Sequence, residues 1–209
     1  MNAPEAAPVR GTEGYAETAN TLVGPYESIT FERTHDTILP LIPAAPARVL
    51  DIGAGTGRDA AALAARGHTV VAIEPTAEMR AHGQRLHPSA AITWIDDSLP
   101  DLAALEAYGG HFDLVMMTAV FMHLDAGERA RAMPRIVRLL KPGAILALSL
   151  RHGPVPPGRR MFEVGAEEMT TLGRTHSLER IHHAERPSMT RAPDVTWTIL
   201  AFSRARSPG

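Results

Sequence analysis

The sequence predicts an α/β fold built on a doubly wound, seven-stranded, mostly parallel sheet. Strand-like and helix-like segments alternate from residue 48 to residue 150, which is the order of a parallel sheet with crossover helices. The strand-like segments are almost continuously apolar, so both faces of the sheet should be covered. Three glycines, Gly53, Gly55 and Gly57, follow the first strand, at the edge where such sheets bind ligands.

The elements of this alternating region follow from its apolar runs and from the residues that end them. Gly67 ends the first helix, and Asp125 with Glu128 predicts a capping box at the start of the last. Pro134 removes a backbone hydrogen bond inside that last helix, so either a kink or a restart is expected there. Strands are predicted at 48–52, 68–73, 91–95, 112–118 and 144–150, and helices at 59–67, 76–86, 98–108 and 126–139.

The alternation stops after residue 150. A loop rich in proline, glycine and arginine covers 151–165, and a short helix is predicted at 167–175. Two further strands, 177–185 and 195–203, are separated by about ten residues, which is close enough for antiparallel neighbours. The sheet should therefore end in an antiparallel edge.

The segment before residue 48 has a different pattern. Residues 1–14 are rich in proline, alanine and glycine and are predicted to be a disordered lead-in. Residues 15–47 are predicted to be helical, interrupted by Gly24-Pro25 and closed by Pro40 and Pro43. The remainder, residues 48–209, is predicted to be one domain.

Composition narrows the classes of function. The chain has 209 residues and a formal net charge of -2, so no global charge attracts nucleic acid or an anionic membrane. It has no cysteine, which excludes disulfides, thiolate nucleophiles and cysteine zinc sites and makes the cytoplasm the default location. No run of about 18 apolar residues could span a bilayer. The histidines lack metal-ligand spacing, so no metal site is predicted.

The glycine turn could serve a dinucleotide or a sulfonium nucleoside. A dinucleotide turn reads G-x-G-x-x-G, but Arg58 stands where its third glycine should be. Asp51, Glu74 and Asp97 fall at the ends of three successive strands. Carboxylates there would repel a phosphate but attract an ammonium group and accept hydrogen bonds from ribose hydroxyls and an adenine amino group. A cationic amino-acid nucleoside therefore fits this turn better than a pyrophosphate.

A series of motifs supports this interpretation. In chain order, DIGAGTG, IEPTAEM, DDSLP, FDLVMMTAVFMHL and RIVRLLKPGAILALSL resemble the motifs of the class I S-adenosylmethionine-dependent methyltransferases. The match covers residues 48–150, and the ordered set is far more specific than any one motif. The resemblance implies a Rossmann-like fold, an N-terminal helical lid formed by residues 15–47, S-adenosylmethionine as methyl donor and S-adenosylhomocysteine as product.

The resemblance also implies roles for individual residues. Three alternatives to these roles remain open. Asp96 could take the place of Asp97 at the adenine, Met79 could be core filler, and Gly57 could be a packing glycine. The implied cofactor residues are Asp51, Gly53, Ala54 and Gly55 at the methionine part, Glu74 at the ribose, Met79, Asp97 and Ser98 at the adenine, and Thr118 with Ala119 beside the cofactor.

Methyl transfer from a sulfonium is an in-line displacement that requires few catalytic side chains. His123, just past the fourth strand, is the candidate general base, and a role in shaping the pocket is the alternative. The candidate acceptor-binding residues are Tyr15, Tyr26 and Phe31 in the lid, and Arg151, His152, Arg159 and Arg160 in the loop after the fifth strand. These arginines could clamp an anionic group or remain solvated.

The sequence thus predicts a methyltransferase acting on an oxygen or nitrogen of a small molecule. Alternatives are a nicotinamide-dependent oxidoreductase, a non-catalytic protein that binds S-adenosylmethionine, and a methyltransferase with an RNA or protein acceptor. Cytosine C5 methylation is excluded because it requires a cysteine adduct. Nucleic-acid contact is disfavoured, since the basic residues at 129–141 fit a solvated helix face. The sequence does not predict an oligomeric state.

Overall fold

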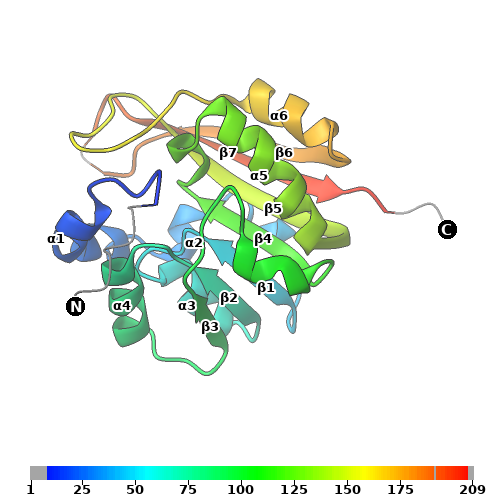
Figure 1. Ribbon diagram of the computed structural model, residues 1–209, viewed down its shortest axis with the longest axis horizontal. Coiled ribbons are helices and arrows are strands. Elements are labelled where there is room, and N and C mark those ends of the chain that lie inside the picture. The colour runs from blue at the N-terminus through cyan, green and yellow to red at the C-terminus, as the bar shows by residue number, and fades with distance from the viewer. Residues whose placement is uncertain (1–8, 191, 207–209) are drawn as a thin grey trace, which may run out of the picture.

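The computed structural model describes residues 9–190 and 192–206, and it has the predicted α/β architecture. A single seven-stranded sheet has the order β3-β2-β1-β4-β5-β7-β6, with helices on both faces (Figure 1). The strands are β1 (Arg48–Ile52), β2 (Thr69–Ile73), β3 (Ile92–Ile95), β4 (Phe112–Thr118), β5 (Leu140–His152), β6 (Leu178–Pro187) and β7 (Thr196–Arg204).

The strand order reverses between β1 and β4. β1 pairs in parallel with β2 on one side and with β4 on the other, so the chain winds outward in opposite directions from this pair. Crossover helices then leave on opposite faces and open a crevice at the carboxyl ends of the two strands. The glycine turn that follows β1 lies at this crevice.

The predicted antiparallel pairing is confirmed, with one refinement. β7 is antiparallel to both β5 and β6. The reversed strand is therefore β7, which lies next to the edge of the sheet, and β6 forms the edge. β7 returns from the β6 hairpin and inserts beside β5. A sequence pattern that marks both strands gives no information on which of them pairs with β5.

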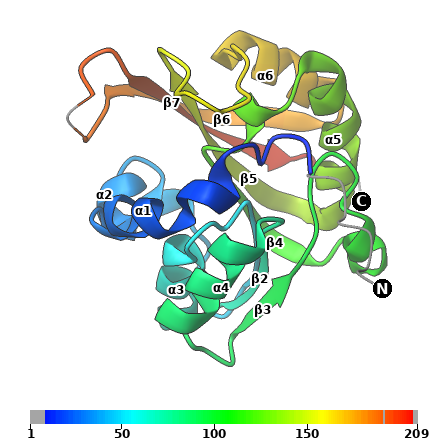
Figure 2. The same cartoon turned by 60° about the vertical axis from the view of Figure 1, so that its left-hand side comes forward.

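Helices cover the two faces of the sheet and form two cores. α3 (Arg58–Ala65) packs on β1 and β2 over one core, and α5 (Ala126–Leu139) and α6 (Ala166–Arg174) pack over the other. α1 (Tyr15–Glu27) lies against α4 (Ala77–Leu86) (Figure 2), and α2 (Phe31–Thr34) lies against α3. No helix among the described residues is long and apolar enough to cross a membrane.

Local predictions are confirmed at some positions and corrected at others. The Asp125–Glu128 capping box is present. α1 continues through Gly24-Pro25. α5 continues through Pro134, because burial of one face of α5 outweighs the cost of one proline, about 3 kcal/mol. The segment predicted as a helix at 98–108 is a short 3-10 helix, Ala103–Tyr108.

The first residues of the chain also differ from the prediction. Residues 9–14, predicted as part of a disordered lead-in, form turns in which the Thr12 amide donates to the Val9 carbonyl at 3.1 Å. Gly11, with φ +93°, packs against the His123 backbone and Cβ. The lead-in therefore contributes to the wall of the crevice, while residues 1–8 lie outside the described residues.

Gly83 allows α4 to pack closely on β3. A Cβ at this position would lie 2.6 Å from Cζ2 of Trp94 and 3.1 Å from the Thr56 carbonyl oxygen. We therefore expect Gly83→Ala to lower the free energy of unfolding by about 1–3 kcal/mol, although alanine favours helices. Urea unfolding measures this change, and the exposed neighbouring substitution Gln84→Ala is the control with little expected effect. A stabilised Gly83→Ala protein would contradict the packing explanation.

Candidate functional site

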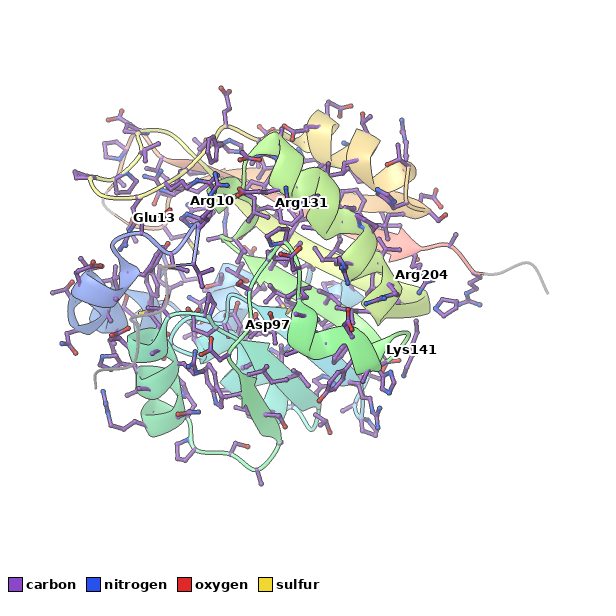
Figure 3. All side chains as sticks on the ribbon, in the orientation of Figure 1. Arg10, Glu13, Asp97, Arg131, Lys141 and Arg204 are labelled. Atoms are coloured by element: carbon purple, nitrogen blue, oxygen red, sulfur yellow. The ribbon has the colours of Figure 1, made fainter. Side chains whose placement is uncertain are left out.

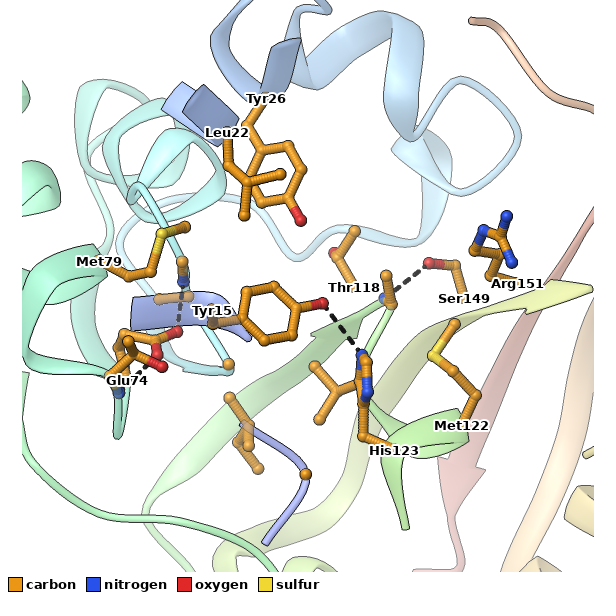
Figure 4. Close-up of a pocket in the computed structure, with 18 of the residues that line it drawn as sticks. Tyr15, Leu22, Tyr26, Glu74, Met79, Thr118, Met122, His123, Ser149 and Arg151 are labelled. Atoms are coloured by element: carbon orange, nitrogen blue, oxygen red, sulfur yellow. Dashed lines mark hydrogen bonds between the residues drawn. The ribbon is translucent and has the colours of Figure 1, made fainter. Parts of the chain in front are cut away.

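A cavity of about 480 Å³ opens at the carboxyl ends of β1 and β4 (Figure 4). This volume lies in the range of sites for cofactors and small molecules. Its walls come from the glycine turn, the ends of β2 and β4, the loop after β3, residues 9–12, α1, the loop after β5 and the β6–β7 hairpin. The cavity therefore joins the predicted cofactor edge to the predicted lid.

The glycine turn is held by the end of β2. The amides of Gly53 and Ala54 both donate to the Ile73 carbonyl, at 2.8 and 2.9 Å. Gly55 has φ +57°, and a Cβ there would meet only Met79 and Tyr26, at 3.7 Å or more. Its backbone therefore faces the cavity and leaves room for a ligand.

Gly57 has a packing role. It has φ +83°, and a Cβ there would lie 2.8 Å from the Trp94 ring. Gly57 therefore permits the close approach of the turn to β3. This packing role is the alternative that the sequence left open.

Asp51 places an unpaired carboxylate oxygen at the cavity. The residue is 1% exposed, and its Oδ2 atom has no hydrogen-bond partner among the described residues. Burial, together with the neighbouring Asp59, raises the pKa of Asp51 well above its usual value. A cationic ligand group would supply the missing partner and restore the charged form.

Asp59, which the sequence reasoning missed, is the centre of a buried network. It accepts hydrogen bonds from Thr118 Oγ1 at 2.7 Å and from the His35 ring at 2.8 Å, and it pairs with Arg58 at 2.7 Å. Burial alone would raise the pKa of Asp59, but these partners, His35 foremost, hold it well below its usual value. Its position as the one acid at the start of an alanine-rich helix was the available sequence signal.

Glu74 braces the glycine turn. It is 6% exposed, its Oε2 accepts from the Gly55 amide and its Oε1 from the Thr76 amide, both at 2.8 Å. Burial raises the pKa of Glu74, and the two amides oppose that shift. The backbone therefore satisfies this carboxylate in part, and each oxygen keeps a second lone pair for a ligand.

The remaining predicted cofactor residues also line the cavity. Asp97 lies in the cavity wall, and its carboxylate accepts hydrogen bonds from the backbone amides of Ser98 and Ala104, at 2.8 and 2.9 Å. Asp96 is not among the lining residues and instead pairs with Arg80 at 2.9 Å, which favours Asp97 at the adenine. The other lining residues from the prediction are Gly53, Ala54, Gly55, Met79, Ser98, Thr118 and Ala119.

The His123 ring is held at both nitrogens, and Figure 4 shows its contact with Tyr15. Nδ1 lies 2.8 Å from the Arg160 carbonyl oxygen, and Nε2 lies 3.1 Å from the Tyr15 hydroxyl. Because a carbonyl only accepts, Nδ1 carries the proton of the neutral ring and Nε2 presents a lone pair to the cavity. Burial lowers the pKa of His123, so the ring stays neutral at physiological pH.

Tyr15 lies between Glu74 and Arg151 in the cavity (Figure 4). Burial, reinforced by the neighbouring Tyr26, raises the pKa of the Tyr15 hydroxyl far above its usual value. The Arg159 guanidinium lies over the Tyr15 ring, 3.7 Å from its centroid, and donates to the Glu13 carbonyl at 2.9 Å. The start of α1 is thereby fixed beside His123.

The predicted acceptor-binding residues divide into two groups. Tyr15, Tyr26, Arg151 and Arg159 line the cavity, whereas Phe31, His152 and Arg160 are not among its lining residues.

The three residues outside the cavity have structural partners. Phe31 is buried in a core beneath α2, and His152 pairs with Thr198 Oγ1 at 2.8 Å. Arg160 pairs with the capping-box residues Asp125 and Glu128 at 3.0 and 2.8 Å. Loop composition gave no information on which arginine would be held this way. No group of three or more potential metal ligands occurs in the described part of the chain.

The doubly wound sheet, the glycine turn and the acidic strand ends define a nucleoside-binding fold of the Rossmann-like class. Residues 49–143 match the family described as a methyltransferase domain. An uncharacterized methyltransferase of Mycobacterium tuberculosis is 34% identical over 133 residues, which is 60% of this chain and 49% of that protein. A ubiquinone biosynthesis O-methyltransferase of Xanthomonas oryzae is 32% identical over 157 residues, covering 72% and 63%.

These matches support a class I S-adenosylmethionine-dependent methyltransferase family for this chain. It spans about half the length of the mycobacterial relative. Among solved structures, the [4+2]-cyclase SpnF aligns over 99% of this chain and 100% of its own, with a TM-score of 0.72 and 16% identity. This likeness concerns the fold alone, so the chemistry has to be argued from the site.

Proposed function

We propose that the protein transfers a methyl group from S-adenosylmethionine to an oxygen or nitrogen of a small-molecule acceptor in the cytoplasm. The observation that carries the proposal is the unpaired, buried Oδ2 of Asp51 at the glycine turn. A buried carboxylate oxygen is costly unless a ligand pairs with it. The α-ammonium group of the donor is such a partner, whereas a dinucleotide phosphate is not.

The lining residues fit the rest of the donor. Gly53, Ala54 and Gly55 would border its methionine part, and Thr118 with Ala119 would flank it. Glu74 would accept from the ribose hydroxyls, and Asp97 with Ser98 would meet the adenine edge beside Met79. The bound donor supplies a methyl group already activated by a sulfonium. The chain therefore has to bind, align and exclude water.

His123 is the residue that would move a proton. Its Nε2 accepts from the Tyr15 hydroxyl at 3.1 Å, and it could take a proton from an acceptor hydroxyl or ammonium that displaces this hydroxyl or passes its proton through it. Arg160 holds the ring through its carbonyl, and the capping box of α5 holds Arg160. The start of α5 therefore holds the His123 ring in place through Arg160.

Equilibrium binding and product formation test this proposal. We expect S-adenosylmethionine and S-adenosylhomocysteine to bind at micromolar concentration while NAD(H) and NADP(H) do not. The reverse result would favour an oxidoreductase. A panel of small hydroxyl and amino acceptors should yield S-adenosylhomocysteine. Tight donor binding without product from any small molecule, protein or RNA acceptor would favour a non-catalytic protein.

Asp51→Asn separates binding from stability. We expect donor affinity to fall at least about tenfold, because one charge-assisted bond is lost. The ionised carboxylate destabilises the fold at neutral pH, since the folded-state pKa of Asp51 is raised. The unliganded variant should therefore melt at the same or a higher temperature than the wild type.

The pH dependence provides a second readout for Asp51. Wild-type affinity should decrease as the pH falls, because a protonated carboxyl offers no charge to the ammonium group, and Asp51→Asn should remove this dependence. Calorimetric titration measures both, with the exposed Asp101→Asn as control. Unchanged affinity in Asp51→Asn would rule out the assigned ammonium partner.

A further inference from the structure

Two arginines and a tryptophan form a row across three neighbouring strands. Arg151 of β5 and Arg186 of β6 both stand opposite Trp197 of β7. Residues directly opposite one another point to the same face of a sheet. Strand spacing places the two outer Cα atoms about 10 Å apart. All three residues line the cavity, so the two guanidinium groups flank the indole at its wall.

Charge is divided between the two ends of the cavity. Its lining carboxylates at the predicted donor end are Asp51, Glu74 and Asp97. The fourth, Asp59, is already paired with Arg58 and the His35 ring. Arg151 lies at the opposite end from Glu74 (Figure 4). Within the described residues, no carboxylate lies within 4.0 Å of the Arg151 guanidinium, whose Nη1 donates to the Pro154 carbonyl at 2.9 Å. Arg151 therefore carries an uncompensated positive charge at this end of the cavity.

Arg186 has an unused donor at the same end. Its Nη2 donates to the Thr34 carbonyl at 2.8 Å, and Asp36, which is mostly exposed, lies 3.6 Å from Nη1. Its Nε atom is buried and has no partner among the described residues. An unpaired buried N–H costs free energy. An oxygen-rich anion in the cavity is the ligand that would relieve this cost at Arg186 and also meet Arg151.

Apolar side chains line much of the rest of the cavity. The body of a ligand would contact their hydrocarbon and thioether groups. The residues that form this apolar part are Leu22, Ile29, Val120, Met122, Met161 and Met189.

We propose that the acceptor is an amphiphilic small molecule with an apolar body and an oxyanion, either carboxylate or phosphate, held between Arg151 and Arg186 against Trp197. This inference rests on the proposed function and specifies its substrate class. The reacting atom would then face His123 and the donor end, because the oxyanion anchors the opposite end. Arg151 and Arg186 are specificity residues and take no part in proton transfer.

Binding of small aromatic probes tests the inference without knowledge of the natural acceptor. 4-Hydroxybenzoate and phenyl phosphate carry the oxyanion, and 4-hydroxybenzamide is the neutral counterpart. Each is titrated calorimetrically into the full protein with and without S-adenosylhomocysteine, at low and high NaCl. Quenching of tryptophan fluorescence gives a local readout, because Trp197 lines the cavity and the only other tryptophan, Trp94, packs against Gly57 and Gly83.

We expect the oxyanions to bind at least about tenfold more tightly than the amide, and NaCl to reduce the difference. Arg151→Gln and Arg186→Gln should each weaken oxyanion binding about tenfold or more, with little change for the amide. The matched control is Arg131→Gln, on the exposed side of α5 (Figure 3). If Arg186→Gln fails to fold, because it loses the contact with Thr34, Arg151→Gln and the salt dependence decide.

Two results would overturn the inference. One is equal affinity for the amide and the oxyanions, and the other is oxyanion binding unaffected by Arg151→Gln. Either result with normal S-adenosylhomocysteine binding leaves the proposed function intact. Failure of S-adenosylhomocysteine itself to bind would instead contradict the proposed function, while the titrations without it still decide the oxyanion site.

Discussion

Replacing Glu74 by alanine should weaken S-adenosylmethionine binding by about 100-fold or more. A carboxylate that accepts from two ribose hydroxyls makes two charge-assisted bonds, each of about 1.5–3 kcal/mol. The same side chain holds Gly55 and Thr76 through their amides, so its loss also releases the turn under the methionine part. Isothermal titration calorimetry with donor and product measures the effect.

Glu74→Gln separates these two contributions. The amide oxygen of glutamine can keep one of the backbone contacts, but the side chain has lost its charge. We expect an affinity between those of the wild type and Glu74→Ala, and a melting temperature close to that of the wild type. Affinity in Glu74→Ala equal to that of the wild type would show that the ribose partner lies elsewhere.

Much of the donor end could be predicted from the sequence because it is local. Asp51, Glu74 and Asp97 each follow an apolar strand, and the carboxyl ends of parallel strands meet at one edge. Their approximate positions therefore follow once the strands are identified. All three line the cavity. What the sequence did not provide was their state, namely that the backbone satisfies Glu74 and that Asp51 keeps a free oxygen.

At the proposed acceptor end only Arg151 was predicted, because the rest depends on pairing between distant strands. Arg151, Trp197 and Arg186 become neighbours only through the register of β5, β7 and β6. A shift of that register by one residue would turn the side chains to the other face. No local pattern in the sequence fixes this register, since either β6 or β7 could have been the strand that pairs with β5.

The structural partners of Phe31 and Arg160 could not be predicted for a related reason. An aromatic residue in a lid and an arginine in a loop each suit either a ligand or a structural partner. Phe31 is buried under α2. Arg160 is held by the capping box, which was itself predicted, but as a feature of the helix alone. The partner of a loop side chain depends on where the loop lies in the fold.

Replacing His123 by asparagine should lower kcat by about 100-fold or more, with donor affinity nearly unchanged. General-base catalysis contributes about 10²–10⁴-fold, and His123 lies outside the expected donor contacts. The readout is release of S-adenosylhomocysteine with an acceptor found in the panel, with exposed His183→Asn as control. Equal kcat in both variants would leave His123 with a role in pocket shape only.

The pH profile distinguishes proton transfer from pocket shape. A protonated ring cannot accept a proton, so activity should be present above the lowered pKa of His123 and decline as the pH falls through it. Because burial lowers that pKa, the decline should occur below the usual histidine value of about 6.5, and it should vanish in His123→Asn.

Tyr15→Phe then tests how the proton reaches the ring. The Tyr15 hydroxyl occupies the Nε2 lone pair at 3.1 Å, so an acceptor must either displace it or pass its proton through it. If the acceptor displaces the hydroxyl, Tyr15→Phe should retain most of kcat, whereas a relay through Tyr15 requires a loss as large as that in His123→Asn. In both cases ¹⁵N NMR should show the proton on Nδ1, because the Arg160 carbonyl holds it there. A proton on Nε2 instead would contradict the assignment of His123 as the base.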